Sequence, residues 1–338
     1  MYKSELIALI KFFSVKKAGN FIRLYISFVI SKVLKKSFIS GLPFAISIEP
    51  TTSCNLGCPE CPSGLKQFTR ETGNLSISLN KKIIDELKGK LTYINYYFQG
   101  EPYINKNFFN FIQYANSKKI FCSTSTNGHF LNDENCKKTI ESGLKRLIIS
   151  MDGNSQETYE IYRKKGKYKK VIDGTKNILK WKKKLNSQYP HVIFQFLVVK
   201  TNEHLIEEMK TLVADLGVDE LRLKTAQFYN YENGNDLIPD NEKYSRYTKT
   251  KNGKYILKNK FPNHCWRMWS SAVVTSKGRI VPCCFDKDAV NTLGNLENGD
   301  FEKIWLSKKY NDFRKQIFLD RKKIEICQNC SEGSKVWA

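Results

Sequence analysis

Between residues 44 and 227 the sequence alternates short runs of β-forming residues with segments of helical periodicity, and no other feature constrains the fold as strongly. The β-type runs are Phe44–Ile48, Tyr93–Phe98, Ile120–Thr126, Arg146–Met151, Val192–Val199 and Glu220–Thr225. The helical segments between them include 81–88, 107–117, 132–142, 168–185 and 205–216. Strands separated by helices build a parallel sheet with right-handed crossovers. The predicted fold class is therefore α/β.

Changes in composition divide the rest of the chain. A length of 338 residues suggests two domains. Residues 229–264 are polar and rich in Asn, Asp, Tyr and Lys, which is typical of a linker, and the part that follows has its own cysteines. We therefore expect a helical N-terminal segment at 1–42, the β/α core at 43–228, a linker at 229–264 and a second domain at 265–338.

Three cysteines lie on one short loop directly after the first expected strand. Cys54, Cys58 and Cys61 form a CxxxCxxC pattern. Thiolates are soft ligands that select iron–sulfur clusters or zinc over hard cations. A zinc site usually takes four protein ligands, and no fourth Cys or His lies near this loop. The loop is therefore predicted to hold a four-iron cluster through three thiolates, which leaves one iron open.

With this loop and four later segments, the chain resembles the radical S-adenosylmethionine (SAM) superfamily. The segments are Gln-Gly-Glu-Pro at 99–102, Thr-Asn-Gly at 126–128, Ser-Met-Asp-Gly at 150–153 and Thr-Tyr-Glu-Ile-Tyr-Arg at 158–163. Two positions depart from the family pattern. Family members have Gly-Gly-Glu-Pro where this chain has Gln-Gly-Glu-Pro, so Gln99 replaces the first Gly. Glu60 stands where many members have an aromatic residue.

The resemblance implies a partial (β/α)6 barrel of the TIM type, with its chemistry at the C-terminal ends of the strands. It also implies that SAM binds the open iron. Gly100 and Glu101 would then receive the ammonium group of SAM, and Ser150 would touch its ribose. Arg163 would bind its carboxylate, which matches the fork of a guanidinium group.

A second set of cysteines follows residue 264, in an order that resembles the SPASM and twitch extensions of radical SAM proteins. The resemblance implies one auxiliary four-iron cluster, and its expected ligands are Cys265, Cys283, Cys327 and Cys330. Cys284 is the alternative to Cys283, and no cysteine after Cys330 could serve a further cluster. A zinc site with four cysteine ligands is the competing interpretation. Cys122 and Cys136 are expected to be packed thiols.

Residues 1–40 carry eight Lys and Arg against one acid, Glu5, interleaved with apolar residues at helical spacing. No uninterrupted apolar stretch approaches the ~20 residues that span a bilayer, and no signal-peptide cleavage pattern follows. Two interpretations stay open. The segment is either a basic amphipathic helix on an anionic membrane surface, or it caps the catalytic domain.

The net charge and the grouping of the cysteines limit which partners and which cellular compartment we expect. The formal net charge is +23, but no nucleic-acid-binding module accompanies it, so nucleic acid is not an expected partner. Closely grouped cysteines are typical of metal ligation in a reducing compartment. We therefore expect a cytoplasmic protein, either free or peripheral at the inner face of the membrane.

Together the motifs predict an oxidoreductase-like radical SAM enzyme. It would cleave SAM reductively to a 5′-deoxyadenosyl radical and take hydrogen from a peptide or small-molecule substrate. The auxiliary cluster would assist net oxidation, and a donor such as flavodoxin or ferredoxin would supply electrons. The alternatives are an iron–sulfur electron-transfer or scaffold protein without radical chemistry, and a lipid- or glycolipid-modifying radical SAM enzyme. SAM binding separates the scaffold from the enzymes, because a scaffold has no need of Glu101 or Arg163.

Overall fold

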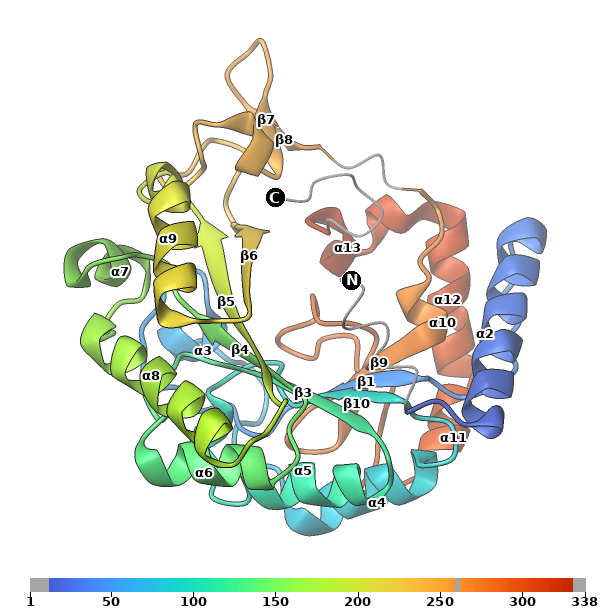
Figure 1. Ribbon diagram of the computed structural model, residues 1–338. Coiled ribbons are helices and arrows are strands. Elements are labelled where there is room, and N and C mark those ends of the chain that lie inside the picture. The colour runs from blue at the N-terminus through green and yellow to red at the C-terminus, as the bar shows by residue number, and fades with distance from the viewer. Residues whose placement is uncertain (1–11, 259–261, 331–338) are drawn as a thin grey trace.

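The computed structural model describes residues 12–258 and 262–330, and a curved nine-stranded sheet forms its centre (Figure 1). The strand order is β11-β10-β9-β1-β2-β3-β4-β5-β6. The strands of the β/α part are β1 (Ala45–Ile48), β2 (Tyr93–Asn95), β3 (Phe121–Thr126), β4 (Arg146–Ser150), β5 (His191–Val198) and β6 (Glu220–Thr225). All of these neighbours pair in parallel, which confirms the predicted α/β class with a parallel, barrel-like sheet.

The expected helices are present, with small shifts at their ends. The longer helices between the strands are α4 (Ile77–Leu87), α5 (Phe108–Ser117), α6 (Asp133–Glu141), α8 (Tyr168–Lys184) and α9 (Ile206–Leu216). Helix α4 begins before the predicted residue 81, because the Ser76 side chain caps it by accepting a hydrogen bond from Leu79 N (3.1 Å). These helices cover the outside of the curved sheet (Figure 1). The short helices α3 (Pro62–Leu65) and α7 (Gln156–Tyr162) follow β1 and β4.

Strand β2 is shorter than predicted. Its parallel pairing with β1 and β3 ends at Asn95, although the prediction extended to Phe98. Tyr96 N still donates to Ser123 O (2.8 Å), and the chain then turns into the loop that carries Gly100. The apolar character of 96–98 therefore reflects burial at the strand end and not further pairing.

The two faces of the sheet differ in chemistry. Because strand residues alternate between faces, register partners share a side. The face under the helices carries Ile, Val, Leu and Phe side chains of the main hydrophobic core, such as Ile94, Ile149 and Phe194. The opposite, inner face carries polar residues at matched positions, for example Ser150 beside Gln195 and Gln195 beside Arg222. The fold thus places polar side chains inside the barrel.

The chain after residue 264 extends the same sheet. Strand β9 (Ser271–Val274) pairs in parallel with β1, and β10 (Arg279–Val281) and β11 (Gly294–Asn295) follow in antiparallel order. Its helices are α10 (Arg267–Ser270), α11 (Phe301–Trp305), α12 (Lys308–Asp320) and α13 (Glu325–Gln328). The predicted boundary at 265 stays a prediction, and residues 331–338 of that unit lie outside the described residues.

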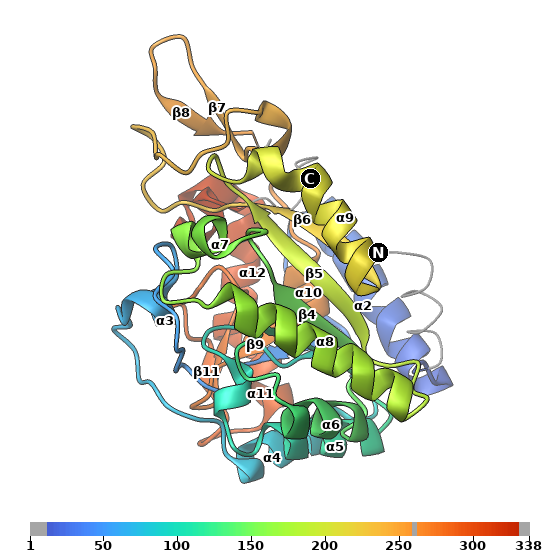
Figure 2. The same cartoon turned by 60° about the vertical axis from the view of Figure 1, so that its left-hand side comes forward.

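The polar segment 229–264 contains a two-stranded hairpin, β7 (Tyr247–Lys249) with β8 (Tyr255–Leu257). The hairpin projects beyond the sheet at one end of the molecule (Figures 1 and 2). Single-turn 3-10 helices lie at 102–104, 203–205, 242–244 and 321–323. The role of the segment 229–264 as a linker stays a prediction.

Of the predicted N-terminal segment, residues 1–11 lie outside the described residues, and the rest contains helix α2 (Val15–Leu34). Phe28 of α2 packs against Trp266 and Trp269, with ring centroids 5.3 and 5.5 Å away. Asn20 accepts a hydrogen bond from Leu42 N (3.0 Å) and donates to Leu42 O (2.7 Å). In the part of the chain that the structure describes, no helix is long and apolar enough to cross a membrane.

Candidate functional site

The cysteine loop lies at the C-terminal end of β1 and is held from several sides. Gly57 N donates to Lys164 O (3.0 Å), and Cys61 N donates to Cys58 O (3.3 Å). The three thiols lie in or against a small apolar cluster that includes Leu56, Tyr162 and Phe228. The structure thus brings the side chains of the predicted cluster loop into one partly buried pocket of apolar groups.

The thiols of this loop influence each other. Burial, helped by the nearby Glu101, Cys61 and Cys58, raises the pKa of Cys54 to about 11, although the hydrogen bond from Leu56 N lowers it. Burial also raises the pKa of Cys58, against the lowering effect of Arg163. The raised pKa values favour protonated Cys54 and Cys58 in the absence of metal, and a cluster would displace these protons. The donor set fits a cluster bound by three thiolates, and the ligand assignment stays a prediction.

Gly100 brings the next loop against the cysteine loop. Its φ is +73°, a conformation that favours glycine, and an added Cβ would lie 2.2 Å from Thr51 O. Gly100 N donates to Ser63 Oγ (2.9 Å), and Glu101 N donates to Ser53 O (2.8 Å). No other residue type allows this approach, so Gly100 fixes the distance between the two loops.

Glu101 is buried and well supplied with donors. Its carboxylate accepts hydrogen bonds from Asn127 N (2.7 Å), Thr126 Oγ1 (2.8 Å) and Tyr103 N (3.3 Å). Burial nevertheless raises the pKa of Glu101 to about 7, because these donors only partly offset the desolvation. Glu101 therefore joins its own loop to the Thr-Asn-Gly turn, and contact with a SAM ammonium stays a prediction.

Arg163 points at the cysteine loop and is held by a residue that the sequence reasoning missed. Its Nη1 donates to Cys58 Sγ (3.8 Å), and its Nε forms an ion pair with Asp152. Burial lowers the pKa of Arg163, but Asp152 and Cys58 raise it more, and the pKa lies well above its ordinary value. Asp152 also accepts from Leu197 N (2.7 Å), so the acid orients the guanidinium. The Ser-Met-Asp-Gly motif contains Asp152 and was the sequence feature that could have indicated this role.

Ser150 and Lys224 lie on the inner face of the sheet. Ser150 ends β4 and is a register partner of Gln195. Lys224 is a register partner of Leu197, which packs against the apolar side chains around the cysteine loop. The Lys224 side chain is exposed, but partial desolvation by the surrounding chain lowers its pKa, and the neighbouring Arg246 lowers it further. Within residues 12–258 and 262–330 the Lys224 ammonium forms no ion pair. Sequence reasoning gave no signal for this residue.

The predicted auxiliary ligands also come together. Burial and the nearby Cys284, Cys265 and Cys327 raise the pKa of Cys283 well above its ordinary value. Cys330 N donates to Cys327 O (3.0 Å), as expected for a CxxC turn at the end of α13. The fourth cysteine, Cys330, is connected to this group through a buried arginine.

That arginine, Arg321, was not singled out from the sequence, which offers no local signal for it. Its Nη2 donates to Cys330 Sγ (3.2 Å), and its Nη1 donates to His264 O (3.2 Å). Burial lowers the pKa of Arg321, but Cys265, Cys330 and Cys327 raise it above its ordinary value. A cation beside the thiols favours their deprotonated form, which is the form that binds metal.

Cys283 and Cys284 point to different surroundings. Cys283 packs against the main core, as does Cys265, and Cys327 belongs to that core, whereas Cys284 packs against a small cluster of Val273, Val281 and Ala289. The two cysteines lie where the chain bends and turns after β10, so their side chains leave the backbone in different directions. This placement favours Cys283 over Cys284 as the predicted ligand.

In the described ranges, no three His, Cys, Asp or Glu side chains converge closely enough to hold a single metal ion. A four-iron cluster takes its thiolates on separate irons, so its ligands do not converge on one point. The two cysteine groups are therefore compatible with clusters and not arranged around one ion.

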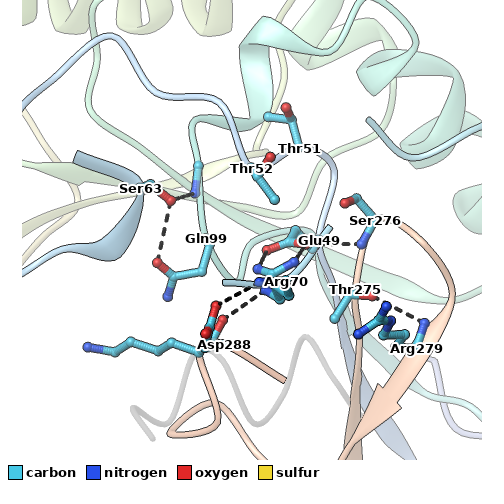
Figure 3. A network of polar contacts seen from close by, with 12 residues as sticks. Glu49, Thr51, Thr52, Ser63, Arg70, Gln99, Thr275, Ser276, Arg279 and Asp288 are labelled. Atoms are coloured by element: carbon cyan, nitrogen blue, oxygen red, sulfur yellow. Dashed lines mark hydrogen bonds and ion pairs between the residues drawn. The ribbon is translucent and has the colours of Figure 1, made fainter. Parts of the chain in front are cut away.

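Figure 3 shows a buried ion pair between Arg70 and Glu49 and the polar residues around it. Arg70 donates to Glu49 through Nη1 (2.9 Å) and Nη2 (2.6 Å), and Ser276 N also donates to Glu49 (3.0 Å). Arg70 Nε donates to Lys287 O (3.0 Å), and Asp288 accepts from Thr69 N (2.9 Å). The loop after α3 is thus joined both to the end of β1 and to the segment that follows Cys283 and Cys284.

Ser63 and Gln99 lie in the same region (Figure 3), where Ser63 Oγ donates to Gln99 Oε1 (3.4 Å). Gln99 Oε1 also accepts from Cys61 Sγ at 3.9 Å. The residue that departs from the family pattern therefore contacts the cysteine loop through its side chain.

Comparisons with known proteins agree with this geometry. Residues 48–208 match the radical SAM superfamily, and residues 265–331 match an iron–sulfur cluster-binding domain named SPASM. The second match favours an iron–sulfur cluster over the zinc interpretation. SAM and four-iron clusters are the cofactors that these domains imply, as predicted.

Curated relatives and solved structures point the same way. The chain is 27% identical to the mycofactocin maturase MftC of Mycolicibacterium smegmatis over 54% of this chain and 45% of that relative, so it spans about half the relative's length. It is 22% identical to the PqqA peptide cyclase of Rhodopseudomonas palustris over 86% and 80% of the two chains.

Streptococcus suis SuiB bound to S-adenosylmethionine has a similar fold, with a TM-score of 0.64 and 14% identity over 91% of this chain and 76% of SuiB. This likeness concerns the fold alone. The predicted resemblance is confirmed by the two domain matches: the chain belongs to the radical SAM superfamily and carries a SPASM domain.

Proposed function

We propose that this protein is a peptide-modifying radical SAM enzyme in which an auxiliary cluster assists a net oxidation. Reductive cleavage of SAM at the open iron of the first cluster would supply a 5′-deoxyadenosyl radical that takes hydrogen from the substrate. The observation that carries the proposal is the arrangement of Gly100, Glu101 and Arg163 around the Cys54–Cys61 loop. A cluster-carrying scaffold would have no use for this arrangement.

The chain's own residues would bind and orient SAM. Asp152 holds Arg163 with its guanidinium toward Cys58, so a carboxylate bound there would lie beside the cluster loop. Glu101 would offer negative charge to the ammonium group. Ser150 Oγ has no hydrogen-bond partner among the described residues and would be free to meet the ribose.

Two observations support a peptide with an acidic group as the substrate. Lys224 lies near the positive charges of Arg246, Arg163 and Lys287, and it has no carboxylate partner among the described residues. An unpaired cation such as Lys224 favours a ligand of opposite sign. The name of the PqqA peptide cyclase states that this relative acts on a peptide.

The electron donor and the location are also proposals. A flavodoxin or ferredoxin is the expected donor, because a net charge of +23 would attract an acidic partner electrostatically. We place the enzyme in the cytoplasm, peripheral to the inner face of the membrane.

The reaction should be measurable before the substrate is known. Anaerobically reconstituted protein, given SAM and a strong reductant, should release 5′-deoxyadenosine slowly, because uncoupled cleavage needs only the first cluster and SAM. Liquid chromatography with mass spectrometry measures this product. If the protein binds SAM and never yields 5′-deoxyadenosine at any reductant strength, the radical chemistry is wrong and the scaffold alternative gains support.

Removing either predicted SAM contact should weaken SAM binding. Glu101→Gln and Arg163→Ala should each cost about 1.5–3 kcal/mol of SAM affinity, the range for hydrogen bonds to charged groups. Equilibrium dialysis of the reconstituted proteins measures the dissociation constant. The matched control is Arg279→Ala, which removes a partly exposed arginine paired with Glu71 and should leave SAM affinity unchanged.

The pH dependence adds a second readout. Because burial raises the pKa of Glu101 to about 7, its carboxylate protonates as the pH falls through that value. SAM should therefore bind the wild type less tightly at about pH 6 than at about pH 7.5, and Glu101→Gln should lose this difference. Equal SAM affinity in all variants would remove both residues from the site.

A further inference from the structure

Helix α2 exposes an apolar stripe on the side opposite to its packed face. The stripe consists of Val15, Ile22, Ile26, Val29 and Val33, spaced seven, four, three and four residues apart, which is one face of a helix. Ile26 is 50% exposed and Val33 73%. Ile30 and Leu34 flank the stripe and are also exposed.

The opposite face of α2 is already in use. Asn20, Leu24, Ser27 and Ser31 are buried, and the side chains of Asn20, Ser27 and Ser31 form hydrogen bonds with the segment 38–42. Phe21 packs edge-on against Phe44 with ring centroids 5.1 Å apart. The helix therefore has a fixed orientation on the protein, and Figure 1 shows it at the edge of the molecule beside α10 and α12. Because α2 already packs on the protein through its other face, the exposed stripe does not contribute to the core.

The charges around the stripe have one sign. Exposed cations border it or follow the helix: Lys16, Arg23, Lys32, Lys35 and Lys36. Helix α2 contains no acidic residue. Cations that flank an apolar face are typical of helices that lie in the interface of an anionic membrane, where the apolar side chains enter the acyl boundary.

We propose that the outer face of α2 docks the enzyme onto the surface of an anionic lipid bilayer. A second copy of the chain is a poor occupant, because it would bring two like-charged helices together, with no acid in α2 to pair with their cations and with +23 on each chain. Lipid headgroups of negative charge supply the missing counter-charge. The proposal concerns location and does not depend on the reaction.

The test uses the full-length reconstituted protein and vesicles of phosphatidylcholine with or without phosphatidylglycerol. Wild type should sediment with the anionic vesicles and lose that binding as salt rises. Ile26→Asp with Val29→Asp should reduce binding to anionic vesicles by about tenfold or more, since both side chains would enter the lipid. Because both residues are exposed, iron content and melting temperature should not change.

A control variant tests whether two added negative charges anywhere on the surface would reduce vesicle binding. Ile256→Asp with Val290→Asp makes the same changes at two exposed apolar residues on other elements and should sediment like wild type. Changing Lys32, Lys35 and Lys36 together to Gln should weaken binding to anionic vesicles while the stripe is intact.

Three results would overturn the proposal. These are no sedimentation of wild type with anionic vesicles, equal loss in the stripe and control variants, and a dimer in sedimentation velocity that only the stripe variant abolishes. The last result would assign the face to a second copy. Release of 5′-deoxyadenosine without lipid, measured on the same samples, reports separately on the proposed reaction.

Discussion

Replacing Cys54, Cys58 and Cys61 together by alanine should abolish 5′-deoxyadenosine release and halve the iron content. The wild type should hold about eight irons and eight sulfides in two four-iron clusters, and the variant about four of each. The loss is expected because SAM would be cleaved at the cluster that this loop is predicted to hold. Iron and sulfide assays, with the ultraviolet–visible spectrum of the reconstituted proteins, measure both quantities.

The auxiliary site supplies a matched control pair. Cys283→Ser should lower the iron content by about four, because Cys283 lies near Cys265 and Cys327. Cys284→Ser should leave the iron content unchanged, because Cys284 packs elsewhere. A wild type with four irons and one zinc, or a triple variant that still cleaves SAM, would contradict the assignment.

Arg70→Ala should destabilise the protein by about 3–5 kcal/mol, the cost of leaving a buried charge without its partner. The Glu49 and Arg70 side chains are 0% and 2% exposed, and after the change Ser276 N remains as a donor to the carboxylate. Chemical unfolding of the reconstituted protein measures the free energy. Since Arg70 also holds Lys287 and lies next to Thr69, the auxiliary cluster should become more labile to chelators.

Arg279→Ala is the control, because its ion pair with Glu71 is exposed and is worth about 0–1 kcal/mol. Adding Glu49→Gln to Arg70→Ala should recover part of the lost stability, because it removes the unpaired buried charge. If Arg70→Ala and Arg279→Ala cost the same, the buried pair does not hold the two cysteine regions together.

The parts that sequence reasoning predicted well depend on neighbours in the chain. The parallel strands and their helices follow from the periodicity of apolar residues, which neighbouring residues in the chain determine. The cysteine groups can be recognised from the spacing of the cysteines in the sequence. Boundaries were less certain, as β2 shows: Phe98 continues the apolar pattern, but pairing ends at Asn95 because only partner strands decide it. The start of α4 depended on the cap at Ser76.

The sequence by itself determined the α/β class, the cysteine groups and the motifs that mark the family. Only the tertiary structure decided which side chains meet across long separations. It paired Arg163 with Asp152, joined Glu49 to Arg70, directed Cys283 and Cys284 to different surroundings and left the outer face of α2 exposed. The physical reason is that such contacts depend on sheet register and helix orientation, which arise when the whole chain packs and which no local pattern encodes.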